Sequence, residues 1–583
     1  MLDEVDWSVL THAYGRADDM VDLLRNAVDE FDELVDRIFA QGTVFPATVA
    51  AVPFIAELAR TAPERRAEFA WLLGMVADPR HASGHVFEAV RAAVTAEKPP
   101  PLDDPDREVR AAAAYIVAQA GGPVTALRER AAVEDEPGVR ASIMLALGHL
   151  DPDGVDRFAR CDSGEERFAA ALAAVRAGRP LPSGAAAAVT AALDKGVELG
   201  FAWMDGEPVD ALIVPATDQT AAELVAALVT SPNAGIRQAA VFAVAERALH
   251  QRRRSTPALL VPLVAPLLAD PEARVRDEVI STLRGCGAAA GPYRDQIAAV
   301  AAHYPQTAGS IAITAESQAL ETMMWLGDQR WVDLAPNRYD VRRVTFTPEV
   351  LDALRRRLAD HPHLAAVLGS WGPQAAAAVP ELVAVLPRDG RTVALALARI
   401  GHPVAEALPY LRELADEADL DAAAAVRLLT GDAQPLLDAF NAVFRKPTGV
   451  RWPAGLDADA ELLPLAPAAR TYLTGEAGRN HNERMTQILA ARLVATATGD
   501  TAAVLPTLWA LVTDNGHNAL GDAAQLLAEL AGDDNQLAER LHHLATRDRR
   551  VIDGGIAADI AWQDEAMAAR LRTIGQHIGE CPH

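Results

Sequence analysis

Histidines and cysteines, the residues that most often carry nucleophilic and metal chemistry, are scattered along this chain of 583 residues. His361 and His363 flank a proline and His542 and His543 are adjacent, so neither pair places two ligands and a carboxylate on one helical face, as HExxH does. The cysteines are Cys161, Cys286 and Cys581, too far apart for a CxxC zinc pair. Neither a P-loop nor a nucleophile elbow occurs. We therefore predict no catalytic, cofactor-binding or metal-binding residue and no enzymatic activity.

Arginine clusters are the residues best suited to binding phosphate. They are Arg252–Arg254, Arg355–Arg357, and Arg547 with Arg549 and Arg550. A nucleic-acid-binding protein needs a continuous basic face, whereas this chain has 80 acidic and 54 basic residues and a net charge of −26. Long acidic stretches separate the clusters, which favours arginines that lie at helix ends near the negative pole of the helix dipole.

Three stretches rich in turn-forming residues each contain one tryptophan. Residues 196–220 carry Trp203, residues 327–348 carry Trp331, and residues 445–456 carry Trp452. Insertions in a repeat array often form the binding face, and Trp, Tyr and Arg are frequent interface anchors. The predicted partner-contact residues are Trp203, Trp331, Arg338, Tyr339, Arg342, Arg343 and Trp452. The alternative, that each tryptophan packs onto adjacent helices and pins its loop, stays open.

The elements that would carry these residues belong to a recurring unit. Residues 104–121 and 270–287 share Asp-Pro, then Val-Arg five and six residues after the Asp, then Gly eleven residues after the Arg. The matched positions are Asp104, Val109, Arg110 and Gly121 in one copy and Asp270, Val275, Arg276 and Gly287 in the other. Weaker copies occur at Val139-Arg140, Ile236-Arg237 and Val426-Arg427.

This spacing indicates paired helices. The Asp is expected to cap free N–H groups, and the Pro suits a first helical turn. The apolar residues that follow recur at helical spacing, and the final Gly suits a left-handed C-cap. A second signature, an aliphatic residue followed by Pro, any residue and Leu or Ile, predicts a proline kink in the first helix of each pair. It occurs at Pro53, Pro380, Pro409 and Pro506 and, in part, at Pro262.

On these residues the chain resembles HEAT-repeat proteins, in particular the short bacterial repeats of the phycobilisome-lyase type. The resemblance implies an all-α, right-handed α-α superhelix (an armadillo- or HEAT-type solenoid) in which the Asp and Arg form hydrogen-bonded ladders between neighbours. The opening residues resemble the start of uncharacterised bacterial HEAT-repeat proteins and are expected to form an atypical N-terminal cap. HEAT-like enzymes that bind iron use His-Glu dipeptides, and none occurs in this chain.

Composition supports this fold class, because apolar residues reach 50% while aromatics are only 5% and alanine makes up much of the difference. The expected divisions are 1–90 (capping helices and first repeat), 91–195 (repeats), 196–220 (insertion), 221–326 (repeats), 327–348 (insertion), 349–444 (repeats), 445–470 (insertion) and 471–583 (C-terminal repeats and cap).

The function that we predict from these features is a non-catalytic scaffold that binds a protein partner along its surface. The acidic balance favours a basic partner, so an inhibitor or immunity-type protein against a basic nuclease toxin is one alternative. A HEAT-like nucleic-acid-binding protein or DNA glycosylase is another. No apolar run is long enough to cross a membrane and no signal peptide is expected, which predicts a cytoplasmic location. The sequence leaves the oligomeric state open.

Overall fold

Helices form almost all of the regular structure in the computed structural model. The model describes residues 2–152, 161–204, 206–304, 314–337, 339–456, 460–474, 480–513, 517–531, 535–552 and 557–580. The chain divides into unit 1, Met1–His250, and unit 2, Gln251–His583. This boundary falls inside residues 221–326, which we predicted from the sequence to be one continuous block of repeats.

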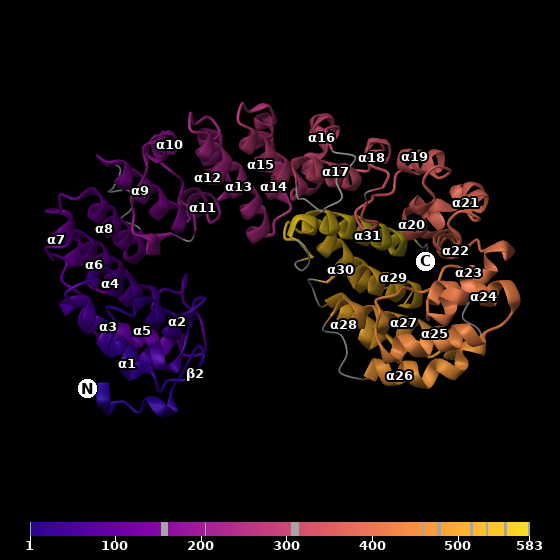
Figure 1. The fold of residues 1–583 in the computed structure, drawn as a ribbon, viewed down its shortest axis with the longest axis horizontal. Coiled ribbons are helices and arrows are strands. Elements are labelled where there is room, and N and C mark those ends of the chain that lie inside the picture. The colour runs from indigo at the N-terminus through magenta and orange to yellow at the C-terminus, as the bar shows by residue number, and fades with distance from the viewer. Residues whose placement is uncertain are drawn as a thin grey trace. The chain divides into compact units, whose positions relative to one another are not determined.

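Unit 1 begins with short elements and continues as a helical stack (Figure 1). Its strands form two antiparallel hairpins, β1 (Thr11–His12) with β2 (Gly15–Arg16) and β3 (Phe39–Ala40) with β4 (Thr43–Val44). Its helices are α1 (Met20–Arg25), α2 (Phe31–Ile38), α3 (Pro46–Thr61), α4 (Arg66–Met75), α5 (Phe87–Ala96), α6 (Arg107–Ala120), α7 (Val124–Ala131), α8 (Pro137–Leu150), α9 (Gly164–Arg176), α10 (Ala185–Lys195), α11 (Pro208–Ile213), α12 (Asp218–Leu228) and α13 (Ala234–Gln251), whose last residue lies in unit 2.

Unit 2 is helical throughout its described part. Its helices are α14 (Ser255–Val264), α15 (Ala273–Arg284), α16 (Arg294–Ala301), α17 (Ala315–Trp325), α18 (Arg330–Leu334), α19 (Pro348–Arg357), α20 (Ala365–Ser370), α21 (Val379–Val385), α22 (Gly390–Ile400), α23 (Leu408–Asp416), α24 (Leu420–Thr430), α25 (Gln434–Arg445), α26 (Ala466–Thr474), α27 (His481–Thr498), α28 (Leu505–Thr513), α29 (Leu520–Ala531), α30 (Asn535–Thr546) and α31 (Ile560–Glu580). Short 3-10 turns join several of them, among them η6 (Gly287–Tyr293), η8 (Gly372–Ala378), η9 (Ala405–Ala407) and η11 (Ala557–Asp559). In unit 1, the 3-10 turn η4 spans Phe201–Trp203.

Alanine-rich helices stack in succession within unit 1. Helix α4 packs on α6, α6 on α8, and α8 on α9 (Figure 1). The central helices are buried on almost every side: Val109 and every residue from Ala111 to Gln119 of α6 are buried. Small alanine side chains permit this close approach. The all-α solenoid predicted from the repeat is confirmed.

The motif residues act at the start of each repeat, with one difference from the sequence-based expectation. Asp104 and Asp270 lie two residues before the N-cap residues Asp106 and Glu272, and each accepts a hydrogen bond from that residue's backbone N–H at 2.9 Å. The aspartates therefore close a local turn ahead of the helix and do not cap it. Gly121 adopts the expected left-handed C-cap conformation, with φ of 70°. The matching Gly287 also has a positive φ, 65°, but it begins η6, and the C-cap residue of α15 is Gly285.

The recurring prolines also differ in part from expectation. Pro53 and Pro262 lie inside helices, as predicted. Pro380 and Pro409 instead occupy the second residue of α21 and α23, directly after the 3-10 turns η8 and η9. Pro506 is likewise the second residue of its helix. A proline there loses no helical hydrogen bond, so at Pro380 and Pro409 the chain passes from 3-10 to α geometry without a kink inside the helix.

The two ends of unit 2 lie against each other. Arg253 pairs with Arg549 in an antiparallel bridge, and the backbone N–H of Arg254 donates to the carbonyl of Asp548 at 2.7 Å. The indole of Trp562 on α31 stacks on that of Trp325, with centroids 5.9 Å apart. The C-terminal helices α30 and α31, yellow in Figure 1, therefore close unit 2 onto its first repeat.

One buried carboxylate makes the stability of unit 1 depend on pH. Burial raises the pKa of Asp210 to about 6, with added repulsion from Glu246 and Glu207. Its Oδ1 is buried and, within the described residues, has no hydrogen-bond partner. A raised folded-state pKa gives stability that is complete below the unfolded value of 3.8 and is lost as pH rises through about 6.

Asp210→Asn is therefore expected to stabilise unit 1 by about 1–2 kcal/mol at pH 7.5, after a discount for partial exposure, and by less at pH 4.5. Thermal unfolding at both pH values measures the gain, with the exposed Glu223→Gln on α12 as the control. An equal gain at both pH values would rule out this assignment.

Candidate functional site

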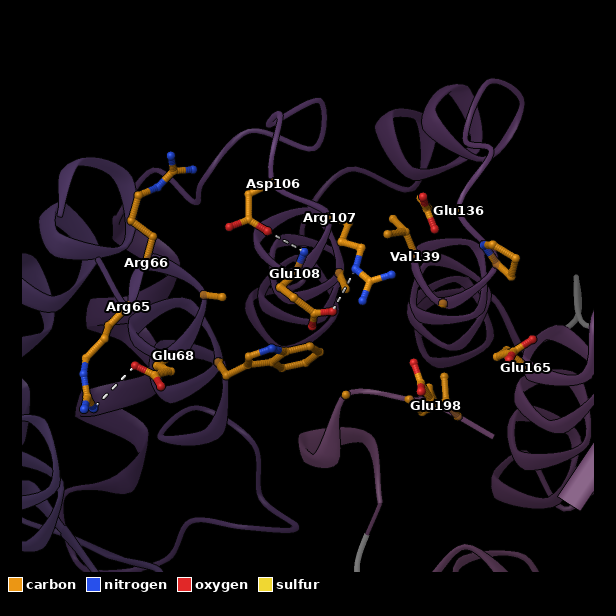
Figure 2. Close-up of a pocket in the computed structure, with 17 residues that line it drawn as sticks. Arg65, Arg66, Glu68, Asp106, Arg107, Glu108, Glu136, Val139, Glu165 and Glu198 are labelled. Carbon is orange, nitrogen blue, oxygen red and sulfur yellow. Dashed lines mark hydrogen bonds and ion pairs between the residues drawn. The ribbon is translucent and has the colours of Figure 1, made fainter. Parts of the chain in front are cut away.

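A groove of about 760 Å³ crosses unit 1 where successive repeats begin (Figure 2). It is lined by the N-terminal ends of α4, α6 and α8, by Glu165 in the first turn of α9, and by residues 198–200 from the first predicted insertion. Because the repeats stack in register, each contributes the same part of its helix to the groove.

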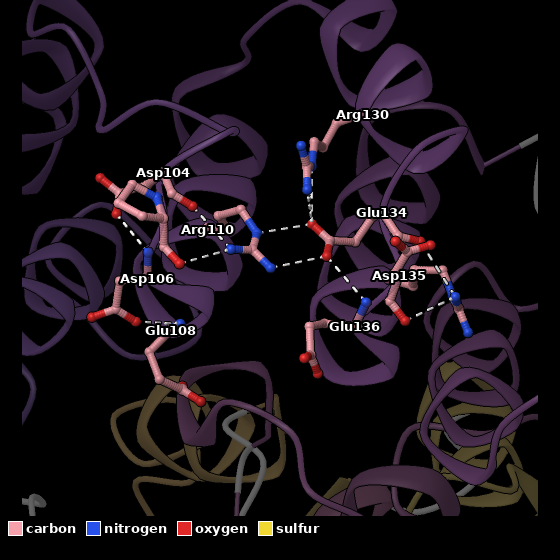
Figure 3. A network of polar contacts seen from close by, with 10 residues as sticks. Asp104, Asp106, Glu108, Arg110, Arg130, Glu134, Asp135 and Glu136 are labelled. Carbon is pink, nitrogen blue, oxygen red and sulfur yellow. Dashed lines mark hydrogen bonds and ion pairs between the residues drawn. The ribbon is translucent and has the colours of Figure 1, made fainter.

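An arginine side chain that bridges the starts of two successive repeats, here called an arginine rung, holds these helix starts together (Figure 3). Arg110 binds both carboxylate oxygens of Glu134, from the next repeat, at 2.9 and 3.0 Å. Its Nη1 also donates to the carbonyls of Asp104 and Pro105, at 2.9 and 3.2 Å. Glu134 accepts a further hydrogen bond from Arg130 at 2.6 Å. Burial alone would raise the pKa of Glu134, but the hydrogen bonds from Arg110 and Arg130 outweigh it and lower the pKa.

The rung recurs with glutamate as the bridging partner. Arg140 bonds to the Glu166 carboxylate of the following repeat and to the carbonyls of Glu134 and Asp135, at 3.3 and 3.1 Å. Arg276 in unit 2 donates to the carbonyls of Asp270 and Pro271 at 2.7 and 2.9 Å. The resemblance implied a ladder of motif aspartates and arginines. In the described part of unit 1, Glu134 occupies the motif position of the aspartate in the next repeat, five residues before Val139, so the Arg110–Glu134 bridge is such a ladder contact with Glu in place of Asp. Arg66 contacts the motif residue Asp104. Arg140 instead pairs with Glu166, which lies outside the motif.

The groove is acidic. Its lining includes six carboxylates and three guanidiniums. Arg65 pairs with Glu68, and Arg107 with Glu108, each at 3.5 Å. Arg66 is engaged by Asp104, which lies outside the lining.

Three carboxylates in the lining are available to a ligand. Glu136, Glu165 and Glu198 form no salt bridge within the part of the chain that the structure describes, and Figure 2 shows them around one end of the groove. Glu136 and Glu165 lie at helix N-termini, where a negative charge is already favourable. Glu198 is three residues past the end of α10, so no helix dipole accounts for it.

Aromatic side chains support the groove from below. The rings of Trp71 and Tyr115 are 5.4 Å apart, and those of Tyr115 and Trp203 are 4.8 Å apart. A Cβ on Gly200 would overlap the Trp71 ring, so only glycine lets the loop pass this close. The Tyr115 hydroxyl donates to Asp78 at 2.6 Å. Burial alone would raise the pKa of Asp78, but the hydrogen bonds from Arg80 and Tyr115 outweigh it and lower the pKa.

Trp203 is a core residue, with 1% of its surface exposed. Its Nε1 donates to the Ser142 hydroxyl at 2.7 Å, and its carbonyl accepts hydrogen bonds from Arg80 and Arg176. The loop is thus tied to α6 through Tyr115, to α8 and to α9. Trp203 cannot contact a partner directly, and it matches the pinning role that we considered for it.

The second loop is also tied down. Trp331 is fully buried, and its ring centroid is 6.2 Å from that of Tyr339, whose hydroxyl donates to the His363 carbonyl at 2.6 Å. Arg343 is mostly buried between Glu321 and Asp559, at 2.9 and 3.2 Å. Arg342 is exposed and pairs with the neighbouring Asp340. The remaining predicted residue, Arg338, lies outside the described residues.

The third loop borders two smaller hollows of unit 2. Trp452 is partly exposed and lines one of about 230 Å³, while Ala454, Gly455 and Leu456 line another of about 330 Å³. Of the six predicted contact residues that the structure describes, Trp452 is the one that lines any of these three cavities.

Members of the first two arginine clusters are engaged with carboxylates. Arg253 and Arg254 pair with Asp548 and Asp564, at 2.6 and 2.7 Å. Arg355 pairs with Glu381 at 2.8 Å, and Arg357 with Asp333 at 2.9 Å. Neutralised in this way, these side chains do not form the continuous basic surface that nucleic acid requires.

The groove carboxylates were not among the residues predicted from the sequence. The available signal was weak: Glu108, Glu136 and Glu165 follow one another at intervals of 28 and 29 residues, close to the repeat length. Glu198 had no such signal, because its position depends on how the loop folds back.

Metal sites and membrane-spanning helices are both absent from the described ranges. No group of three or more His, Cys, Asp or Glu residues there could hold a metal ion. No helix there is long and apolar enough to cross a membrane.

No protein-family model matches the chain, and no curated protein sequence does either. Among solved structures, it is similar to the karyopherin Kap121p bound to the extreme C-terminus of the protein phosphatase Cdc14p, with 14% identity and a TM-score of 0.30 over 86% of this chain. It is also similar to Kap95p in its complex with RanGDP, with 12% identity and a TM-score of 0.33 over 96% of this chain and 86% of that one. A third similar structure is the Kap95:Nup1 complex, with 11% identity and a TM-score of 0.31 over 91% of this chain and 87% of that one.

This chain spans 56% of the length of that Kap121p structure, and likeness at these scores carries no conclusion about what the chain binds. Its own stacked helices and recurring arginine rungs define the fold. The chain has an all-α solenoid fold.

Proposed function

We propose that the chain is a protein-binding scaffold whose unit 1 groove takes a basic, extended segment of a partner protein. The observation that carries the proposal is the row of three carboxylates without salt bridges, Glu136, Glu165 and Glu198, in a groove whose lining is acidic overall. A groove lined by one sign of charge attracts a ligand of the opposite sign.

The repeat also suggests a spacing for that ligand. Packed helices lie about 8–10 Å apart, and an extended chain advances about 3.3–3.6 Å per residue, so one repeat corresponds to about three ligand residues. Glu136 and Glu165 lie at the starts of the neighbouring helices α8 and α9. A segment with Arg or Lys at every third position would therefore meet both carboxylates in turn.

The test is the affinity of the full chain for a nine-residue peptide with Arg at every third position. Each exposed charge pair contributes about 0.2–1 kcal/mol. Neutralising all three carboxylates, by Glu136→Gln, Glu165→Gln and Glu198→Gln together, is therefore expected to weaken binding about tenfold at 0.1 M salt. Fluorescence anisotropy with a dye-labelled peptide measures this change.

A matched triple variant controls for net charge. Glu30, Glu129 and Glu223 are exposed on unit 1 and do not line the groove, so changing them to Gln alters net charge equally. We expect less than a twofold effect, because charges beyond about 10 Å are screened at 0.1 M salt. Equal weakening by both triple variants would show that the attraction is general, and the groove assignment would be wrong.

A further inference from the structure

The hollow beside Trp452 differs in chemistry from the groove of unit 1. It is lined by the loop residues 450–452, by one face of α27, by residues 522–526 of α29 and by Arg570 of α31. Its floor is apolar: Met485, Ile488 and Leu489 of α27 are buried, at 3%, 7% and 2% exposure. An apolar side chain of a ligand would lose water against this floor.

Trp452 forms one wall and is held in place from several sides. Its Nε1 donates to the carbonyl of Leu456 at 2.9 Å, and its ring centroid lies 5.7 Å from that of Phe440. The guanidinium of Arg492 lies 5.9 Å from the indole centroid. With its N–H already used, the indole can offer a ligand only its apolar surface.

The polar part of the lining is basic, although the protein as a whole is acidic. It contains three guanidiniums, those of Arg451, Arg492 and Arg570, and a single carboxylate, Asp522. Asp522 is shared, because it lies 2.9 Å from Arg570 and 3.4 Å from Arg451. The Arg451 side chain is 70% exposed. Its Nε and Nη2 lie 3.4 and 3.5 Å from the Asp522 carboxylate, and its Nη1 takes no part in these contacts. A fork of N–H donors beside an apolar floor suits a carboxylate attached to an apolar group.

We propose that this hollow is an anchor site for a protein segment in which an aromatic or large aliphatic side chain adjoins an Asp or Glu. The apolar side chain enters between Trp452 and α27, and the neighbouring carboxylate binds Arg451. At about 230 Å³ the hollow is smaller than the 300–1,000 Å³ typical of small-molecule sites, which favours a single anchoring side chain over an enclosed metabolite.

The probe is a capped hexapeptide, Gly-Glu-Phe-Glu-Gly-Ser, carrying an uncharged dye and titrated against the full chain. Two reference peptides replace both Glu with Lys, or Phe with Ala. We expect saturable binding of the first peptide and at least tenfold weaker binding of either reference. The lysine peptide lacks the carboxylate that would bind Arg451, and the alanine peptide lacks the apolar side chain that would pack beside Trp452. Failure of the first peptide to saturate, or equal binding of the lysine peptide, would refute the proposal.

Variants locate the binding. Arg451→Gln is expected to weaken binding about tenfold while Asp522 keeps its partner Arg570, and the matched control Arg445→Gln, exposed at the end of α25, should have no effect. Gln525→Trp, which fills the hollow, should abolish binding. Unchanged affinity in both pocket variants would place the peptide elsewhere and overturn the assignment. The basic peptide of unit 1 should bind all of these variants normally, so the two proposals fail independently.

Discussion

Replacing Trp203 with alanine is expected to lower the free energy of unfolding of unit 1 by about 3–5 kcal/mol, the usual cost of truncating a large buried aromatic side chain. The change removes a fully packed indole that touches Tyr115 and also leaves the Ser142 hydroxyl without its donor at 2.7 Å. Because the loop of Trp203 also carries Glu198 and Gly200 to the groove, affinity for the basic peptide should fall in parallel.

Native-state hydrogen exchange of α6 and α8 measures the loss, since their buried amides open only when the stack of unit 1 opens. Trp203→Phe is the graded control: it keeps an aromatic ring but loses the hydrogen bond to Ser142, and it should cost about 1–2 kcal/mol. If Trp203→Ala left exchange in α6 and α8 unchanged while weakening peptide binding, the indole would be a contact residue and not a structural pin.

Arg254→Gln is expected to destabilise unit 2 by about 3 kcal/mol, because it leaves a buried carboxylate without its cation. The Asp564 side chain is 1% exposed and lies 2.7 Å from Arg254, while Arg254 also donates to the carbonyls of Leu544, Ala545 and Arg547 at 3.1, 2.9 and 2.9 Å. Loss of the guanidinium therefore removes both the ion pair and the cap on the C-terminal end of α30. Backbone N–H groups of Val551 and Ile552 still hold Asp564, which keeps the loss from being larger.

Arg253→Gln provides the comparison one residue away. The pair of Arg253 with Asp548 has side chains 44% and 39% exposed, and its loss should cost about 0.5 kcal/mol. Hydrogen exchange in α31 and α15 distinguishes the two variants, because closure brings these helices into one cooperative structure. Similar small effects of both substitutions would show that the ends of unit 2 are not held together by the buried pair.

The helices were predictable because their signals are local. The Val-Arg motif, its apolar stripe and glycines such as Gly121 lie within one repeat, and each determines its own turn of structure. The role of Arg110 was also within reach, since it binds the carbonyls five and six residues before it. Its partner Glu134 lies five residues before Val139, at the position that the motif Asp occupies in the clearer copies, so the contact follows the repeat although this copy lacks the Asp-Pro pair.

The candidate sites depend on contacts that no local pattern encodes. The sequence singled out Trp203 and Trp452 by the same composition, yet one loop buries its indole under the groove and the other leaves it partly exposed at a hollow. Arg253 and Asp548 are 295 residues apart, so closure of unit 2 was invisible to repeat periodicity. We predicted that the clustered arginines lie at helix ends, whereas the Arg254 side chain forms an ion pair with the buried carboxylate of Asp564 and so links the two ends of unit 2.

Hydrogen–deuterium exchange of the full chain, with and without the peptide that carries Arg at every third position, tests the central claim most directly. We predict protection at the groove residues 65–71, 106–111, 136–139 and 198–200, and less protection in the triple glutamine variant at the same peptide concentration. Protection confined to other parts of the chain, or none at a peptide concentration that saturates binding, would contradict it.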